Sequence, residues 1–170
     1  MVIHMDQKRA EAEIWKTLET VMDPEVPALS VIDLGIVRKV SVTETGGVDV
    51  DVTPTYSGCP ATDLINAIIK AAIETSGFDD VTIHTVLSPA WTTDWISEDG
   101  RKKLKEYGVA PPVGQAATGK AALFGVSPDV GCPQCDSKNT EQVSEFGSTA
   151  CKAMYRCLDC GEPFEYFKCI

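Results

Sequence analysis

The chain has 170 residues and a net charge of -10 at pH 7, and this length suffices for a domain of about 110 residues with a small appendage. The net negative charge argues against a nucleic-acid partner, since such proteins need positive charge to bind phosphate groups. The one short basic run, Arg101 to Lys105, suits a solvated helix face. No apolar run approaches the roughly 18 residues that span a bilayer, and the N-terminus does not resemble a signal peptide. We therefore expect no membrane partner and a cytoplasmic protein with reduced thiols.

The first predicted element is a helix that Asp6 can cap and that runs to about Met22. Its apolar residues recur at helical spacing and predict one packed face (Ile14, Leu18 and Val21). The segment 23–27, Asp-Pro-Glu-Val-Pro, must end this helix, because each proline disfavours helix for the residue before it. A second turn follows at 33–35, Asp-Leu-Gly.

Two strands with an alternating pattern come next, at 36–43 and 48–53. The Gly46-Gly47 pair between them is typical of a hairpin, since glycine tolerates the positive φ of tight turns. Valine and aspartate alternate along the second strand, so the valines should face a core and the aspartates solvent. This period of two predicts a sheet with one wet face.

The stretch from Thr53 to Ala61, Thr-Pro-Thr-Tyr-Ser-Gly-Cys-Pro-Ala, predicts a strand end, a tight turn and a helix start. Pro60 suits the first helical position, which makes Cys59 the candidate N-cap residue. Unpaired backbone N–H groups and the positive end of the helix dipole would then favour the thiolate form of Cys59, as nucleophile or metal ligand. The alternative is a small, buried and inert side chain, the usual role of a free cysteine.

Three further elements are predicted from the same signals: a core helix, a strand and a short helix (60–76, 81–87 and 97–107). The order of elements, with one hairpin, predicts an α+β fold in which a small mixed or antiparallel sheet carries helices on one face. His84 lies on the predicted third strand, and we expect it to be structural because a lone histidine is a weak ligand signal.

The composition changes after residue 110. From 111 to 130 Pro, Gly, Ala and Thr dominate without a lasting pattern, which predicts a linker in which Leu123 and Phe124 could dock on a neighbouring surface. Six of the seven cysteines lie beyond residue 131. We therefore expect a first domain at 1–110, a linker at 111–130 and a cysteine-rich module at 131–170.

The module contains two Cys-x-x-Cys knuckles separated by 21 residues, which is close to zinc-ribbon spacing (Cys132, Cys135, Cys157 and Cys160). Four thiolates can close a tetrahedron around one ion, and the ion substitutes for a core that about 40 residues cannot build. The spacing favours zinc, followed by a single iron or an iron–sulfur cluster. Short strands are predicted at 143–146, 152–156 and 164–168. Cys151 and Cys169 belong to neither knuckle, and they are expected to be packing residues, with transfer ligands near the ribbon as the alternative.

Four motifs in residues 1–110 together resemble the small domain shared by the SUF-associated T protein and the cytosolic iron–sulfur targeting factors (Asp23-Pro24-Glu25, Val31 to Gly35, Thr53 to Ala61 and Ser88 to Trp91). The resemblance implies a role in iron–sulfur cluster maturation, with a reactive or cluster-binding cysteine at Cys59. It also implies a pocket around that cysteine (Glu25, Asp33, Thr53 and Thr55). If Glu25 and Asp33 face Cys59, their charges oppose the thiolate, and its reactive role would rest on metal binding.

The C-terminal module narrows the resemblance, because residues 146–152, the second knuckle and residues 162–170 are similar to the D-protein family of bacterial phenylacetate degradation. That family accompanies the multicomponent phenylacetyl-CoA epoxidase, a di-iron oxygenase. The resemblance implies partners within that system, with the ferredoxin-type reductase as the expected client and a homodimer left open. The sequence has no flavin or nucleotide fingerprint and no Glu-x-x-His pair, so we do not expect it to perform the oxygenation itself.

Three functions are compatible with these features. The leading hypothesis is an accessory maturation factor in which Cys59 receives or holds iron or a cluster and the ribbon docks on the client. The second is a structural subunit in which Cys59 only packs and the ribbon binds protein. The third is a thiol-dependent enzyme acting on CoA esters, which would need a base near Cys59 where the sequence offers acidic residues and no histidine.

Overall fold

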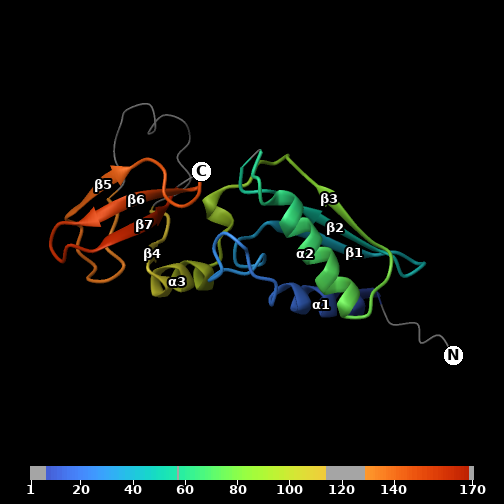
Figure 1. Cartoon of the computed structure of the whole chain (residues 1–170). Helices are drawn as coiled ribbons and strands as arrows, with labels where there is room; N and C mark the ends of the chain where they lie inside the picture. Colours follow the sequence, from blue (N-terminus) through green and yellow to red (C-terminus); the bar gives the residue numbers. More distant parts are fainter. Residues whose placement is uncertain (1–6, 57, 114–128, 169–170) are drawn as a thin grey trace. The chain divides into compact units, whose positions relative to one another are not determined.

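The computed structural model describes residues 7–56, 58–113 and 129–168 (Figure 1). It divides into two compact units, Met1–Trp91 and Thr92–Ile170. No helix among the described residues is both long enough and apolar enough to cross a membrane.

The first unit is a three-stranded sheet with two helices. Its elements in chain order are α1 (Gln7–Leu18), β1 (Val37–Val42), β2 (Val48–Val52), α2 (Thr62–Thr75) and β3 (Val81–Thr85). The hairpin β1–β2 is antiparallel, whereas β3 lies parallel to β2 after the crossover through α2. The sheet is therefore mixed, with strand order β1-β2-β3.

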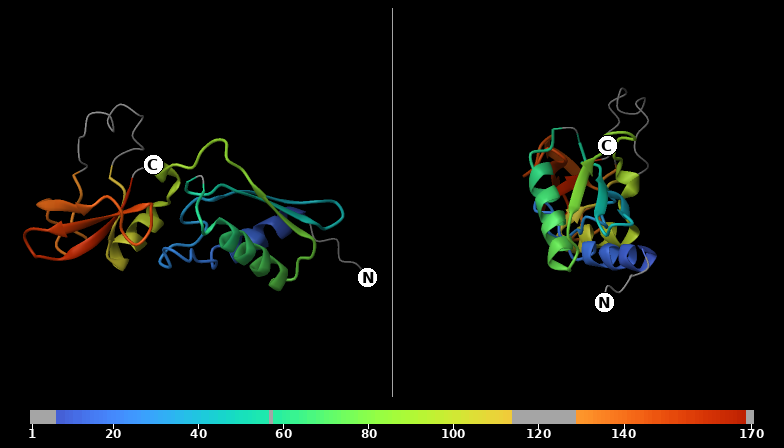
Figure 2. Two further views of the ribbon diagram at one scale, coloured as in Figure 1. Left: turned by 45° about the horizontal axis from the view of Figure 1, so that its top comes forward. Right: turned by 90° about the vertical axis from the view of Figure 1, so that its right-hand side faces the viewer.

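The two helices lie side by side against one face of this sheet (Figure 2). They bury Ile14 and Leu18 from α1 and Ile69 and Ile73 from α2, all fully inaccessible to solvent. Along β2 the valines are buried and the aspartates between them are half-exposed, as the alternating pattern predicts. The expected α+β fold with helices on one face is confirmed.

The first helix ends earlier than expected, at Leu18 instead of about Met22. Met22 forms an antiparallel bridge with Ser30, so the chain has already turned back on itself by that point. The proline-rich segment 23–27 therefore does not end the helix. It forms a turn of its own, in which the carboxylate of Asp23 accepts the backbone N–H groups of Glu25 and Val26, both at 2.8 Å. The expected cap, Asp6, lies outside the described residues.

The second unit contains a short 3-10 helix η1 (Thr93–Trp95), α3 (Glu98–Tyr107) and four strands: β4 (Val109–Ala110), β5 (Thr140–Ser144), β6 (Lys152–Cys157) and β7 (Pro163–Phe167). The strand order is β4-β7-β6-β5, with β4 parallel to β7 and the other pairs antiparallel. The helix α3 is capped at both ends, since the Ser97 hydroxyl accepts the Gly100 N–H and Gly108 ends the helix with φ of 92°.

The boundary between the compact units lies before Thr92, whereas the sequence placed the end of the first domain at residue 110. Two contacts explain the difference. The strand β4 pairs with β7 and so extends the sheet of the cysteine module. The guanidinium of Arg101 in α3 donates to the carbonyls of Thr93 and Pro112, each at 2.8 Å, which fastens the chain on both sides of the helix. Composition alone does not reveal such pairings. Most of the expected linker, including Leu123 and Phe124, lies outside the described residues.

Candidate functional site

A small pocket in the first unit collects Cys59 with Glu25 and Thr55, as the sequence predicted. Its walls also include Asp23 from the turn after α1, Thr62 and Asn66 from α2, and apolar side chains from the sheet. The cavity volume is about 20 Å³. It therefore offers room for one water-sized occupant, such as a single metal ion.

Cys59 does not occupy the N-cap position that the sequence predicted for it. The cap residue of α2 is Ala61, in helical conformation and without a side-chain hydrogen bond, and the helix starts at Thr62. Cys59 and Pro60 belong to the preceding turn, in which the Thr62 N–H donates to the Cys59 carbonyl at 3.2 Å. Pro60 thus lies two residues before the first helical residue, and the first-turn N–H groups are not presented to the thiol by capping geometry. The side chain is nonetheless only 9% exposed and lines the pocket.

Asp33 and Thr53, the two other expected pocket residues, are not among those that line it. The Asp33 carboxylate accepts the backbone N–H of Ser30 at 3.0 Å and its hydroxyl at 2.9 Å, so it holds the 30–35 turn together. Thr53 is 2% exposed, and its hydroxyl has no hydrogen-bond partner among the described residues. Of the two expected carboxylates, Glu25 therefore lines the cavity, whereas Asp33 stabilises a backbone turn.

Sequence reasoning missed Asn66 as a pocket residue. Its amide nitrogen donates to the Thr85 hydroxyl on β3 at 3.3 Å, while its buried carbonyl oxygen has no partner among the described residues. One sequence feature could have indicated Asn66: Thr62 and Asn66 are four residues apart, so they share one helix face above the turn that carries Cys59. This spacing is a weak indication, because a polar residue in a helix usually faces solvent.

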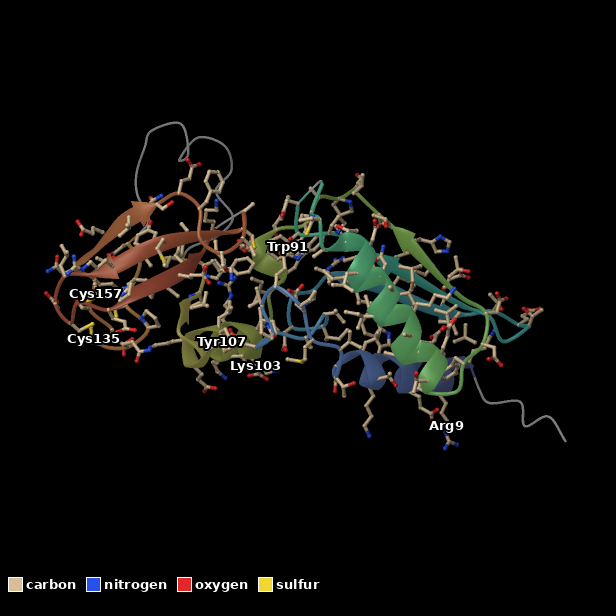
Figure 3. The ribbon with its side chains drawn as sticks, in the orientation of Figure 1. Arg9, Trp91, Lys103, Tyr107, Cys135 and Cys157 are labelled. Carbon is tan, nitrogen blue, oxygen red and sulfur yellow. The ribbon has the colours of Figure 1, made fainter. Side chains whose placement is uncertain are left out.

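The four cysteines of the second unit converge at one end of the ribbon sheet, where Figure 3 labels Cys135 and Cys157. All four Sγ atoms lie within 4.8 Å of one another. The Sγ distances are 3.8 Å between Cys132 and Cys160 and 3.6 Å between Cys135 and Cys157. Bonds of about 2.3 Å to a tetrahedral ion would place the sulfurs about 3.8 Å apart. The donor set thus fits one metal ion, and the module is a four-cysteine metal-binding site.

Backbone N–H groups that donate to these thiols change their pKa values. The N–H of Cys160, helped by that of Asp159, outweighs burial and lowers the pKa of Cys157 to about 7. The Ser137 N–H also acts to lower the pKa of Cys135, but hydrogen bonding with Cys160 and burial outweigh it and raise that pKa to about 12. In the metal-free ribbon one thiol is therefore ready to bind a cation at neutral pH, and others release their protons as the ion arrives.

The leftover Cys151 is buried and does not join the metal-binding group. Its thiol lies 3.0 Å from the Thr149 hydroxyl, which suits a packing role. Cys169 lies outside the described residues. His84 does have a partner, since its Nε2 lies 2.9 Å from the Asp49 carboxylate on the neighbouring strand, with both side chains close to half exposed.

Comparison with known families assigns both parts of the chain. Residues 11–85 match the iron–sulfur cluster assembly protein family, and residues 116–168 match the PaaD zinc beta ribbon domain. The Escherichia coli (strain K12) protein named as the D subunit of 1,2-phenylacetyl-CoA epoxidase is 50% identical over 93% of this chain and 92% of its own length. A second relative, an Fe-S protein maturation auxiliary factor of Porphyromonas gingivalis, is 36% identical over 56% of this chain and 91% of its own.

Solved structures match more than half of the chain. The DUF59 domain from Bacillus anthracis superposes with a TM-score of 0.55 at 26% identity, covering 58% of this chain and 93% of that domain. The conserved hypothetical protein TM0487 from Thermotoga maritima gives a TM-score of 0.50 at 28% identity, covering 59% of this chain and 98% of that protein. The short relatives thus cover just over half of this chain, whereas the E. coli protein covers nearly all of it. The chain belongs to the D-subunit family of phenylacetyl-CoA epoxidase, and it joins an iron–sulfur cluster assembly domain to a PaaD zinc beta ribbon.

Proposed function

We propose that this protein is an accessory maturation factor of the phenylacetyl-CoA epoxidase system, in which Cys59 receives iron and passes it to a client. The observation that carries the proposal is the pocket, because it sets a buried thiol beside the Glu25 carboxylate in a cavity of about 20 Å³. Thiolate and carboxylate together suit iron. Relatives that cover 56% and 54% of this chain are named Fe-S protein maturation auxiliary factors, which supports an accessory role in iron–sulfur assembly.

The size of the pocket supports a single ion as the cargo, since a cluster would need a larger cavity. Glu25, which lies in the turn fixed by Asp23, would supply the second ligand. None of the residues that line the pocket is a histidine, which leaves a thiol-dependent hydrolase without its usual base.

The expected client is the ferredoxin-type reductase of the epoxidase, because its cluster requires both iron and sulfide. The cytoplasm, where thiols stay reduced, is the compartment that this chemistry requires. The decisive experiment compares Cys59→Ser with Cys151→Ser in the complete system. Both replace a buried thiol, but only Cys59 lines the pocket. We expect Cys59→Ser to lower the cluster content of the reductase and Cys151→Ser to leave it unchanged. Equal cluster content in both variants would refute the proposal.

We also propose that the ribbon holds zinc. The sulfur separations of 3.6 and 3.8 Å support a single ion over a cluster, whose thiolates bind different iron atoms and would lie further apart. Metal analysis with an absorption spectrum of anaerobically purified protein tests this. One equivalent of zinc, without absorption in the visible range, is expected in both the wild type and Cys59→Ser. Visible absorption that is lost in Cys157→Ser would assign iron to the ribbon instead.

A protein-docking role that does not involve Cys59 is the second candidate, and exposed apolar side chains of the ribbon favour it. Val143, Phe146 and Leu158 are each more than half exposed. Exposed aromatic and aliphatic groups of this kind often mark protein interfaces. Two results would favour this function over the first. The protein should bind purified epoxidase subunits and lose this binding in Phe146→Ala, and the reductase should keep its full cluster content in Cys59→Ser.

A further inference from the structure

The two cysteine knuckles are joined by a polar clasp, formed by Asp159, Ser137 and Asn139. Asp159 lies between the two cysteines of the second knuckle, and the other two residues closely follow the first knuckle. The Ser137 hydroxyl donates to one carboxylate oxygen of Asp159 at 2.5 Å, and the Asn139 amide donates to the other at 2.7 Å. One carboxylate therefore uses both of its oxygens to bind the opposite half of the metal site.

Backbone hydrogen bonds make the clasp continuous with the cysteines. The Leu158 N–H donates to the Asn139 carbonyl, and the Cys132 N–H donates to the Ser137 carbonyl, both at 2.9 Å. The Asn139 N–H in turn donates to the Ser137 hydroxyl at 3.0 Å. A displacement of either knuckle would therefore break charge-assisted hydrogen bonds as well as metal–sulfur bonds.

We propose that Asp159 is a positioning residue that holds the four thiols together and slows the release of the metal ion from the ribbon. Loss of the ion requires the knuckles to separate, and the clasp opposes that separation whether or not a sulfur has already dissociated. Partners outside the ligand shell commonly change metal affinity by about 10- to 100-fold in proteins. The ribbon would then retain its ion, which distinguishes it from a site built to hand metal on. This inference concerns the ribbon alone and does not depend on the role of Cys59.

Asp136 provides a matched control. It is also an exposed aspartate beside a metal-binding cysteine, but it belongs to the first knuckle and its carboxylate pairs with Lys105 of α3 at 2.5 Å. Among the described residues it has no hydrogen bond to the second knuckle. Replacing Asp136 removes the same charge at the same distance along the chain from a cysteine, but leaves the clasp intact.

The test measures how fast the zinc-loaded, full-length protein transfers Zn²⁺ to the chromogenic chelator 4-(2-pyridylazo)resorcinol. We expect Asp159→Ala to accelerate transfer at least 10-fold. Asp136→Asn removes the charge of Asp136 but keeps a residue that tolerates the positive φ of 60° at this position, and it should change the rate less than 2-fold. Asp159→Asn should fall between Asp159→Ala and the wild type, because an amide of the same shape can still accept from Asn139 and donate to Ser137. This partial rescue separates positioning from a general loss of folding.

Two results would overturn the inference: transfer from Asp159→Ala at the wild-type rate, or equal acceleration in Asp136→Asn and Asp159→Ala. If Asp159→Ala does not take up zinc, Asn139→Ala decides, since it removes one hydrogen bond of the clasp and keeps the carboxylate. It should then release zinc several-fold faster than the wild type, and wild-type release would count against the clasp.

Discussion

The indole N–H of Trp91 donates to the backbone carbonyl of Leu34 at 2.9 Å, and the Trp91 side chain is 3% exposed. The contact joins two sequence motifs, Ser88 to Trp91 and Val31 to Gly35, that lie far apart along the chain. Asp33, in the second of these motifs, holds the same turn through Ser30. Two of the motifs shared with iron–sulfur assembly proteins therefore stabilise one turn, and they do not line the pocket.

Trp91→Phe should destabilise the first unit by about 1–3 kcal/mol, because it removes the only donor on the ring and leaves the Leu34 carbonyl without that bond. Urea denaturation followed by far-UV circular dichroism measures this loss. Tyr107→Phe is a suitable control, since this ring is 58% exposed and its hydroxyl should contribute less than about 0.5 kcal/mol. Equal midpoints for Trp91→Phe and the wild type would show that the hydrogen bond contributes nothing.

A buried ion pair in the ribbon predicts a dependence of stability on pH. Lys152 Nζ lies 2.9 Å from Glu165 Oε2, and the Lys152 side chain is 5% exposed. Burial raises the pKa of Glu165, but hydrogen bonds from Lys152 and Ser148 outweigh it, so that the pKa lies below its ordinary value. A carboxylate with a lowered pKa in the folded state stabilises the fold above its unfolded pKa, and this contribution is lost as the pH falls through the folded pKa.

Lys152→Met should therefore destabilise the ribbon by about 2–3 kcal/mol at pH 7, near the low end for breaking a buried pair because Glu165 remains partly exposed. The difference between the variant and the wild type should shrink as the pH falls below about 4. Denaturation curves at pH 7 with zinc in excess test the first statement, and the same curves in a Glu165→Gln background, which mimics the protonated carboxyl while the zinc stays bound, test the second. If Lys152→Met costs as much stability in the Glu165→Gln background as in the wild type, the effect belongs to packing alone.

Periodic patterns predicted most elements of both units, but they did not predict η1 or β4, and they placed a strand at 143–146 where β5 runs from Thr140 to Ser144. The reasons for the errors are specific. The valines of β2 and the caps of α3 are local signals, so the expected strand and helix are found where the sequence placed them. The start of α2 depends on how the turn at Cys59 packs, and Pro60 is compatible with a turn as well as with a first helical position. Local rules could not distinguish the two.

The two candidate sites also differ in how far the sequence could predict them. The four-cysteine site could be predicted in full, because the spacing of its ligands is itself the signal. The Cys59 pocket could be predicted only in part, since the resemblance named conserved residues without separating those that line the cavity from those that fix its turns. Glu25 belongs to the first kind and Asp33 to the second. The contribution of Asn66 depends on tertiary packing of α2 against β3, which no short motif encodes.

Gly147 is required by a close approach between the β5–β6 turn and the sheet. A Cβ atom at this position would lie 2.7 Å from Glu165 Oε1 and 3.3 Å from the Lys152 Cβ. Because Glu165 is held by the ion pair and by the Ser148 N–H, it cannot move aside without breaking these contacts. Gly147→Ala should therefore destabilise the ribbon by about 1–3 kcal/mol, as overpacking does elsewhere.

Gly131→Ala is the matched control for this substitution, measured in the same urea titration. A Cβ atom there would meet the end of the Lys138 side chain at 3.2 Å, and this flexible exposed group can move away. We expect a change below about 0.5 kcal/mol for Gly131→Ala. If both variants lose the same stability, the effect belongs to glycine replacement in general and not to the contact with Glu165.

Removal of the metal should unfold the ribbon and leave the α+β unit folded. The ribbon core is small, and Cys132 and Cys157 are themselves part of it, so the binding energy of the ion is folding energy for this sheet. The first unit has its own core around α1, α2 and the three-stranded sheet.

Hydrogen–deuterium exchange, read by mass spectrometry after treatment with a chelator, measures the stability of the two units separately. Amides of β5, β6 and β7 should lose protection by at least 10-fold, whereas those of β1 and β2 should exchange at unchanged rates. The same pattern is expected for Cys157→Ser without chelator. Protection of β6 that survives in both cases would show that the ribbon sheet is stable without its ion, because its interior strand would then be held by hydrogen bonds and apolar packing alone.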